Sequence, residues 1–229
     1  MSLFAIADLH LSLGTNKPMD IFRGWTDYVS RLESNWKKLV TDNDTVIIGG
    51  DISWAMKLEE TYEDFKFINE LPGRKIFIKG NHDYWWQTKK KIEDYLKQNC
   101  FDTISIMFNN AYELDNYAVC GTRGWFYDAE ADADKKIINR EAGRLRTSIE
   151  AALKTGKVPV AFLHYPPVYQ GRECEELMNI LLEYKIGKCY YGHLHGSNAF
   201  KYAVTGDYKG VEMHLVSCDY LRFIPNLIR

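Results

Sequence analysis

Short apolar runs alternate along the chain with amphipathic stretches, and this alternation is typical of an α/β fold. The apolar runs have strand length and are separated by turn-forming or helical segments. They predict seven strands, at Leu3–Asp8, Thr45–Gly50, Lys75–Lys79, Thr103–Phe108, Tyr117–Gly121, Val158–His164 and Lys188–Tyr191.

Apolar residues at helical spacing, among them Tyr28, Leu32 and Trp36, predict a helix between the first two strands. After residue 196 the pattern changes to strict alternation, which predicts a hairpin of Ala199–Val204 with Val211–Val216. No internal repeat or Pro/Gly/Ser-rich linker interrupts the chain, so we expect one domain over residues 1–229. The other predicted helices are Glu59–Leu71, Tyr84–Leu96, Ala129–Leu153 (one long helix or two short ones) and Glu173–Leu182.

The composition is that of an ordinary globular protein, with 46% apolar and 26% charged residues among 229. A net charge of -2 gives no global attraction to nucleic acid or to an anionic membrane. The five cysteines are widely spaced and form no C-x-x-C pair, which favours free thiols in a reducing compartment. The N-terminus lacks a signal-peptide pattern, and no apolar run approaches the roughly 20 residues of a membrane span. We therefore expect a cytoplasmic location, with neither membrane nor nucleic acid as a partner.

Carboxylate, amide and imidazole groups stand where the predicted strands end. They lie in the segments Asp8-Leu9-His10, Gly49-Gly50-Asp51, Gly80-Asn81-His82-Asp83, His164 and Gly192-His193-Leu194-His195. Five of the six histidines fall in these segments; the sixth, outside them, is predicted to be structural or exposed. Since ligands of open α/β sheets bind outside the carboxyl ends of the strands, we expect these groups to form one site.

The spacing within these segments has a physical meaning. In extended chain, residues i and i+2 point the same way, so Asp8 with His10, and His193 with His195, can each reach one centre. Mixed nitrogen and oxygen donors suit Mn, Fe, Zn or Ni better than Ca. Each segment alone also has a structural interpretation, because Asx residues favour turns and helix N-termini. Their joint occurrence in this order favours a metal site.

These five blocks resemble the calcineurin-like metallophosphoesterases, whose pattern is D-x-H, G-D, G-N-H-[DE], a single H and G-H-x-H. The resemblance runs from Asp8 to His195, and the short sequence segments around Asp51 and His82 resemble those of a poorly characterised bacterial branch of the family. It implies an α/β fold of two mixed β-sheets packed as a sandwich and flanked by helices. Two departures stand out. Trp54 replaces a second Asp found in many members, and His82 differs from the Arg of lipid-A-precursor hydrolases.

The resemblance also implies roles for the residues of each block. His82 would lie beside the substrate, with Asp83 orienting its ring. The cofactors would be two divalent or trivalent ions, with Mn, Fe, Zn and Ni as candidates. Asp8, His10 and His195 would hold one ion, Asn81, His164 and His193 the other, and Asp51 would bridge both.

These ligands predict a mechanism for phosphate ester hydrolysis. Two carboxylates against two divalent ions leave a cationic centre that attracts phosphate and lowers the pKa of a bridging water toward roughly 7. We expect the resulting hydroxide to attack phosphorus in line with the leaving group, and His82 to donate a proton to the departing oxygen. The predicted substrate is a phosphodiester or phosphomonoester of a small molecule or nucleotide.

Three further features leave alternatives open. Arg123 follows a predicted strand and is either a phosphate clamp or an ordinary surface arginine. The acidic residues 130–134 are predicted to be a solvated helix start rather than a ligand set. A group of aromatic residues either stacks a base or sugar of the substrate or packs in the core: Trp54, Tyr84, Trp85, Trp86 and Trp125.

Other functions compete with the small-molecule esterase. One is a non-catalytic metal-binding scaffold on the same fold, although such relatives lack key histidines and this chain keeps His82. A nuclease or a protein phosphatase is a third possibility, against which the charge and the chain length weigh mildly. The sequence leaves the native metal and the oligomeric state open.

Overall fold

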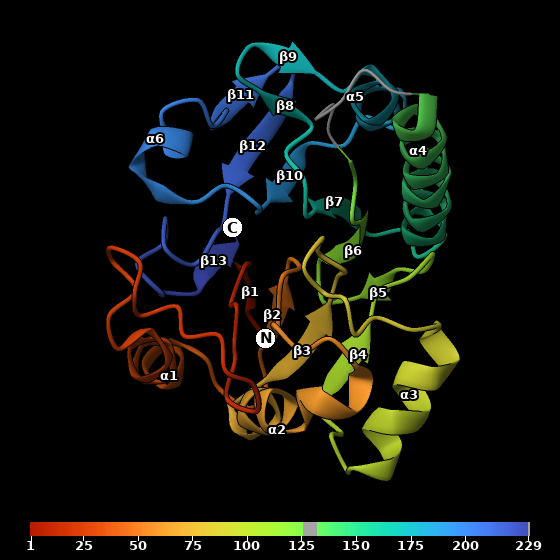
Figure 1. The fold of residues 1–229 in the computed structure, drawn as a ribbon. Helices are drawn as coiled ribbons and strands as arrows, with labels where there is room; N and C mark the ends of the chain where they lie inside the picture. Colours follow the sequence, from red (N-terminus) through yellow and green to blue (C-terminus); the bar gives the residue numbers. More distant parts are fainter. Residues whose placement is uncertain (126–131, 229) are drawn as a thin grey trace. The chain divides into compact units, whose positions relative to one another are not determined.

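The computed structural model of the chain describes residues 1–125 and 132–228 (Figure 1). The chain forms two compact units, Met1–Ile106 with Val216–Arg229, and Met107–Leu215. Each unit is built on one large mixed sheet flanked by helices, which confirms the predicted fold class. The single domain expected over residues 1–229 stays a prediction.

The first unit has a five-stranded sheet in the order β13-β1-β2-β3-β4, in which only β13 runs antiparallel. The central strands are fully or nearly fully buried, as expected of apolar runs covered on both faces. The strands are β1 (Leu3–Ile6), β2 (Thr45–Ile48), β3 (Arg74–Phe77), β4 (Ile104–Ile106) and β13 (Asn226–Ile228).

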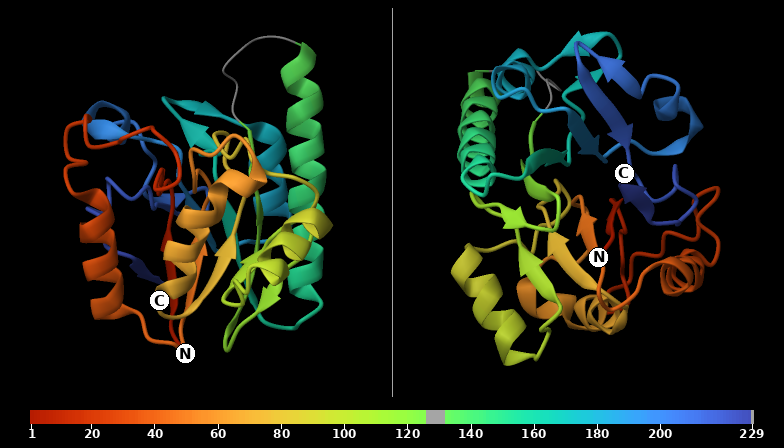
Figure 2. Two further views of the ribbon diagram at one scale, coloured as in Figure 1. Left: turned by 60° about the horizontal axis from the view of Figure 1, so that its bottom comes forward. Right: turned by 180° about the vertical axis from the view of Figure 1, so that it is seen from behind.

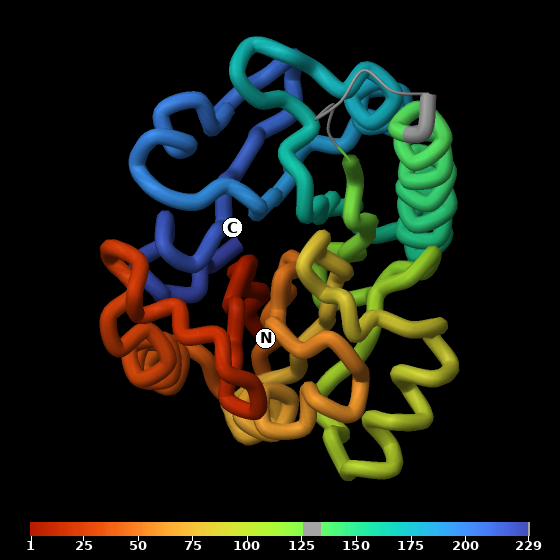
Figure 3. Tube along the Cα trace, in the orientation of Figure 1, coloured from red at the N-terminus to blue at the C-terminus, as the bar shows by residue number. Residues whose placement is uncertain are grey.

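Three helices cover this sheet, and each buries the apolar face that its spacing predicts. Tyr28, Leu32 and Trp36 of α1 (Tyr28–Leu39) are buried, and the Trp36 indole donates to the carbonyl of Pro72 at 2.9 Å. The predicted helix 59–71 is a 3₁₀ turn followed by α2 (Tyr62–Glu70). Figure 3 traces the long loop from β1 into α1.

The helix expected from Tyr84 begins later, as α3 (Lys89–Gln98). Thr88 stands just before it and its hydroxyl accepts from the Lys91 N–H at 3.4 Å, so the N-terminus is fixed there. Residues 84–87 instead form the turn that carries the loop after β3 back into the fold. The predicted start of the helix was too early, because the aromatic residues of that turn match helical spacing.

The second unit has a six-stranded sheet in the order β11-β12-β10-β7-β6-β5, with a small separate β8-β9 hairpin. Four neighbouring strands, β12, β10, β7 and β6, run parallel. The strands are β5 (Tyr112–Glu113), β6 (Tyr117–Thr122), β7 (Val158–Leu163), β8 (Val168–Tyr169), β9 (Arg172–Glu173), β10 (Lys188–Tyr191), β11 (Gly206–Tyr208) and β12 (Val211–Leu215).

Helices α4 (Asp132–Leu153) and α5 (Glu175–Glu183) pack on one face of this sheet and against each other (Figure 2). Leu145 and Ile149 of α4 and Leu181 of α5 share one apolar cluster with the strands. The structure bears out α4 as one long helix; its expected start at residue 129 lies outside the described residues.

The predicted hairpin 199–216 is wrong in its first strand. Residues 196–200 form a short helix, α6 (Gly196–Phe200), and the hairpin is β11-β12, with Tyr208 opposite Val211. Its two-residue turn is Lys209-Gly210, both with positive φ (56° and 87°), as a tight hairpin requires. Alternation places a first strand at residues 199–204, because a short apolar run does not distinguish one helical turn from a strand.

Candidate metal centre

In the first unit, the carboxyl ends of three neighbouring parallel strands bring the first three sequence blocks together. The register aligns Ile6 of β1 with Ile48 of β2, and Ile48 with Phe77 of β3. Backbone hydrogen bonds continue past the strands, from Asp8 N to Gly50 O (2.9 Å) and from His10 N to Asp51 O (2.9 Å). The loops that carry the donors are therefore paired to one another, and the parallel sheet sets their spacing.

The strands end earlier than predicted because the donors leave the extended conformation. Asp8, His10 and Asp51 have φ of 62°, 46° and 50°, in the left-handed region that costs a non-glycine residue free energy. Such conformations persist only where the surrounding structure holds them, and they concentrate at functional sites. Three of them at adjacent strand ends mark this edge as more than a set of connecting turns.

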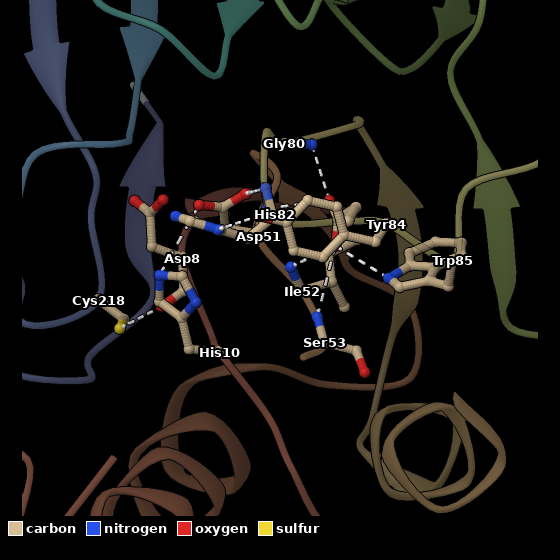
Figure 4. A network of polar contacts seen from close by, with 11 residues as sticks. Asp8, His10, Asp51, Ile52, Ser53, Gly80, His82, Tyr84, Trp85 and Cys218 are labelled. Carbon is tan, nitrogen blue, oxygen red and sulfur yellow. Dashed lines mark hydrogen bonds and ion pairs between the residues drawn. The ribbon is translucent and has the colours of Figure 1, made fainter. Parts of the chain in front are cut away.

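The side chains of these residues are buried and lie close together (Figure 4). The Asp51 carboxylate accepts from the His82 backbone N–H at 2.8 Å through Oδ1, and its Oδ2 lies 3.8 Å from His10 Nε2. Asn81 is half-buried in the turn that follows β3. Gly80 is required in that turn, because a Cβ there would lie 2.1 Å from both Asp51 N and Asp51 Oδ1.

Asp83 makes its described hydrogen bonds with groups other than the His82 ring, which it was expected to orient. Its buried carboxylate accepts from the N–H groups of Gly80 (2.7 Å), Ile52 (2.8 Å) and Asp51 (3.0 Å), and from the Trp85 indole at 3.0 Å. Burial, and then the Asp51 carboxylate, raises its pKa. Asp83 thus ties the loop after β2 to the turn after β3.

The ring of His82 lies among aromatic side chains. Its Nδ1 is 3.2 Å from the Tyr84 hydroxyl, and its centroid is 4.6 Å from that of Trp54. Trp54 also stacks on His10, with centroids 4.8 Å apart, and the Lys17 ammonium lies 4.8 Å from the Trp54 centroid. Trp54 therefore packs between two imidazoles, where many relatives of the resembled family have a carboxylate.

Sequence reasoning missed several residues that support this edge. Cys218 donates to the Asp8 carbonyl at 2.8 Å, and Tyr28 donates to the His10 carbonyl at 3.0 Å. Asp64 accepts from the Leu13 N–H at 2.7 Å and from the Ser53 hydroxyl. Each is far from its partner in sequence, so no local pattern identifies it.

In the second unit, the same arrangement recurs at the ends of β6, β7 and β10. Thr122 is paired with Leu163, and Leu163 with Tyr191, so Arg123, His164 and the segment around His193 follow at one edge. The Arg123 carbonyl accepts from both His164 N (3.0 Å) and Tyr165 N (2.9 Å). Gly121 allows the close pairing, because a Cβ there would lie 2.0 Å from the Phe162 carbonyl oxygen.

His164 is fully buried, and its ring centroid is 5.2 Å from that of His193. Tyr165 packs on the His193 ring at 4.2 Å. His193 has φ 71°, the same unusual conformation as the donors of the first unit. His195 is the residue directly before α6.

The family model for calcineurin-like phosphoesterases matches residues 1–197, which include all five sequence blocks. The chain belongs to this family. Membership of this family suggests metal-dependent hydrolysis of phosphate esters and supports a hydrolase that binds metal. No functionally curated protein matches the chain.

Solved structures share this calcineurin-like fold at low sequence identity. A protein of unknown function from Aquifex aeolicus matches at TM-score 0.56 and 18% identity, over 99% of this chain and 95% of its own. A phosphopantetheinyl hydrolase from Mycobacterium tuberculosis matches at TM-score 0.54 and 16% identity, with the same coverage. A protein from Thermus thermophilus matches at TM-score 0.55 and 11% identity, over 84% of this chain and 81% of its own. These likenesses show the fold.

The donor set of this calcineurin-like phosphoesterase fits a divalent metal ion. Two donor atoms on one ion, each about 2.1 Å from it, are at most roughly 4 Å apart. The 3.8 Å between His10 Nε2 and Asp51 Oδ2 lies within that limit. Buried carboxylates and imidazoles are the oxygen and nitrogen ligands of borderline divalent ions.

The remaining predicted features separate into core and surface. Trp85 is buried against Phe65, and Trp86 packs on Trp85, whereas Tyr84 is exposed. Trp125 lies beneath the Arg123 guanidinium, 4.7 Å away. His214 stacks on Tyr190, with ring centroids 4.4 Å apart. All five cysteines have free thiols. In the described part of the chain, no helix has the length and apolar character to cross a membrane.

Proposed function

We propose that this protein hydrolyses phosphate esters at a centre of two metal ions. The support is the set of left-handed donors at parallel strand ends, together with the family match over residues 1–197. The proposed ligands are Asp8, His10 and His195 for one ion, Asn81, His164 and His193 for the other, and Asp51 between them.

Bound divalent ions supply Lewis-acid polarisation of the phosphate and activation of the water that acts as nucleophile. The chain's own contribution is to hold the donors before the substrate arrives. His82 N–H fixes one oxygen of Asp51, and Tyr28 and Cys218 fix the carbonyl groups of His10 and Asp8. A donor set fixed in this way loses little conformational entropy on binding metal.

His82 is the proposed general acid for the leaving group. Its backbone is tied to Asp51, and Tyr84 Oη lies beside Nδ1 at 3.2 Å. With Nδ1 facing Tyr84, Nε2 is the nitrogen that would carry the proton to the departing oxygen. Tyr84 takes the place toward the ring that had been expected of Asp83, and Asp83 is a positioning residue for the loops.

A metal-reconstitution assay tests the proposal. Purified protein is stripped of metal, loaded in turn with Mn, Fe, Ni, Zn or Mg, and assayed with bis-p-nitrophenyl phosphate and p-nitrophenyl phosphate. We expect metal-dependent turnover that is lost in Asp51→Asn and kept in Asp102→Asn, a matched change at an exposed position. The ratio of diester to monoester turnover would narrow the substrate.

Each other outcome has a distinct meaning. Two bound metals per chain without turnover on either ester would favour the non-catalytic scaffold. A chain that binds none of the five metals would overturn the proposed centre. A small-molecule or nucleotide substrate and a cytoplasmic location stay predictions.

A further inference from the structure

Three guanidinium groups surround one buried carboxylate in the second unit, directly beside the His164 strand end. Glu141 of α4 is fully buried, and its Oε1 lies 2.7 Å from Arg144 Nη1, 3.7 Å from Arg140 Nε and 3.9 Å from Arg123 Nη2. Thr122 donates to the other oxygen, Oε2, at 2.6 Å. The group of Arg123, Arg140 and Arg144 is called here the arginine cluster.

The arginine cluster carries more positive charge than its described surroundings neutralise. Three guanidinium groups lie within 4 Å of the Glu141 carboxylate, so its ion pairs leave two positive charges over, and Asp134 on the same helix instead binds the Trp125 indole at 3.3 Å. Like charges held this close are costly unless an anion shares them.

The cluster is also poised to bind rather than merely to pack. Arg123 Nε is buried without an acceptor among the described residues. Trp125 and Phe108 flank the faces of Arg123 and Arg144, at 4.7 and 4.8 Å, which fixes the planes of both forks. The side chains are 14%, 54% and 28% exposed for Arg123, Arg140 and Arg144, so the cluster opens from a buried base toward solvent.

Its position relates the cluster to the proposed chemistry. Arg123 follows β6 in register with the strand that ends at His164, and its carbonyl binds the N–H of that histidine. We infer that the arginine cluster is a subsite for a second phosphate group of the substrate, separate from the phosphate that is hydrolysed. The assignment of this second phosphate to the substrate rests on the proposed function, whereas the binding of an anion at the arginine cluster does not. Planar guanidinium forks recognise phosphate through paired hydrogen bonds.

The first test measures anion binding without metal, so that it stands apart from any failure of catalysis. Metal-stripped protein in excess EDTA is titrated with inorganic pyrophosphate at constant ionic strength, by calorimetry and by tryptophan fluorescence. We expect saturable binding that Arg140→Gln weakens roughly tenfold and Arg140→Lys weakens less. Arg140 is the most exposed member, so thermal unfolding should show an intact fold.

Arg146→Gln is the matched control, because Arg146 lies on the same helix and is paired with Glu183 at 2.7 Å instead. The inference fails if wild-type protein does not bind pyrophosphate, or if the two Gln variants weaken binding equally.

The second test uses two substrates that differ by one phosphate. These are thymidine 5′-(p-nitrophenyl phosphate) and the same compound with a 3′-phosphate, assayed with the metal-loaded enzyme. We expect a lower KM for the compound with two phosphates, and loss of that preference in Arg140→Gln but not in Arg146→Gln. Anion binding without any such preference would overturn the role as a substrate subsite.

Discussion

The carboxylate of Asp83 accepts a hydrogen bond from the backbone N–H of Asp51, 32 residues earlier in the chain, at 3.0 Å. It accepts from Ile52 and Gly80 as well, and from the indole of Trp85. One buried side chain therefore holds the proposed bridging ligand and the turn that carries Asn81. Asp83, the fourth residue of the G-N-H-D block, therefore fixes the backbone of the loops that carry the proposed ligands, and it makes no described hydrogen bond with the His82 ring.

Asp83→Asn replaces an acceptor oxygen with an amide that faces backbone donors. We expect the free energy of unfolding to fall by about 3 kcal/mol, since a buried network loses one of its charged members. Metal content, measured by elemental analysis, should fall together with turnover. If Asp83 acted only on the His82 ring, metal content would stay at the wild-type value, as it should in Asp102→Asn.

His82→Ala removes the proposed proton donor but none of the proposed metal ligands. We expect two metals per chain to be retained and turnover to fall roughly a hundredfold or more toward an alkyl ester, whose leaving group needs a proton. The loss should be smaller with p-nitrophenolate, a good leaving group. Unchanged turnover of the alkyl ester would remove His82 from this role.

Gly80→Ala tests the close packing at the proposed metal edge. The added Cβ would meet Asp51 N and Oδ1 at 2.1 Å, so Asp51 and its loop must move. We expect metal affinity to fall at least tenfold, measured by competition with a chelator. Gly143→Ala is the control at an exposed position of helix α4, where nothing lies within 4 Å of the new Cβ, and it should stabilise the protein by about 0.5–1 kcal/mol. Equal metal affinity in both variants would contradict the packing argument.

Asp64 predicts a pH-dependent stability. Burial raises its pKa from 3.8 to about 6, so the folded state binds more protons than the unfolded state between these values. Its contribution to stability is therefore fully present below pH about 4 and is lost as the pH rises through about 6. Asp64→Asn cannot ionise and lacks this dependence.

The measurement is chemical unfolding of metal-free wild-type protein and Asp64→Asn at several pH values. The free energy of unfolding of the wild type, relative to the variant, should decrease by on the order of 1–3 kcal/mol from pH about 4 to about 7. If the difference in unfolding free energy between the two proteins stayed constant over that range, the pKa of Asp64 would not be raised in the folded state.

Much of the site could be read from the chain because its chemistry is local. Asp8, Asp51 and His164 each stand within three residues of an apolar run, and parallel strands must place such residues at one edge. The parallel strands of both sheets were recognised, most of them because a buried parallel strand is a continuous apolar segment, whereas the antiparallel strands β5, β11 and β13 were missed. The hairpin after residue 200 was misplaced because its turn depends on the positive φ of Lys209, which no hydrophobic pattern encodes.

The sequence by itself determined the family, the places of the parallel strands along the chain and the donor types at their ends, because strand periodicity and short motifs are properties of neighbouring residues. Only the tertiary structure decided that Asp83 binds backbone rather than the His82 ring, and that Arg123 faces Glu141 of α4 with two other arginines. Those partners are brought together by sheet register and helix packing. Such contacts join residues far apart in the chain, so their energy leaves no local pattern to read.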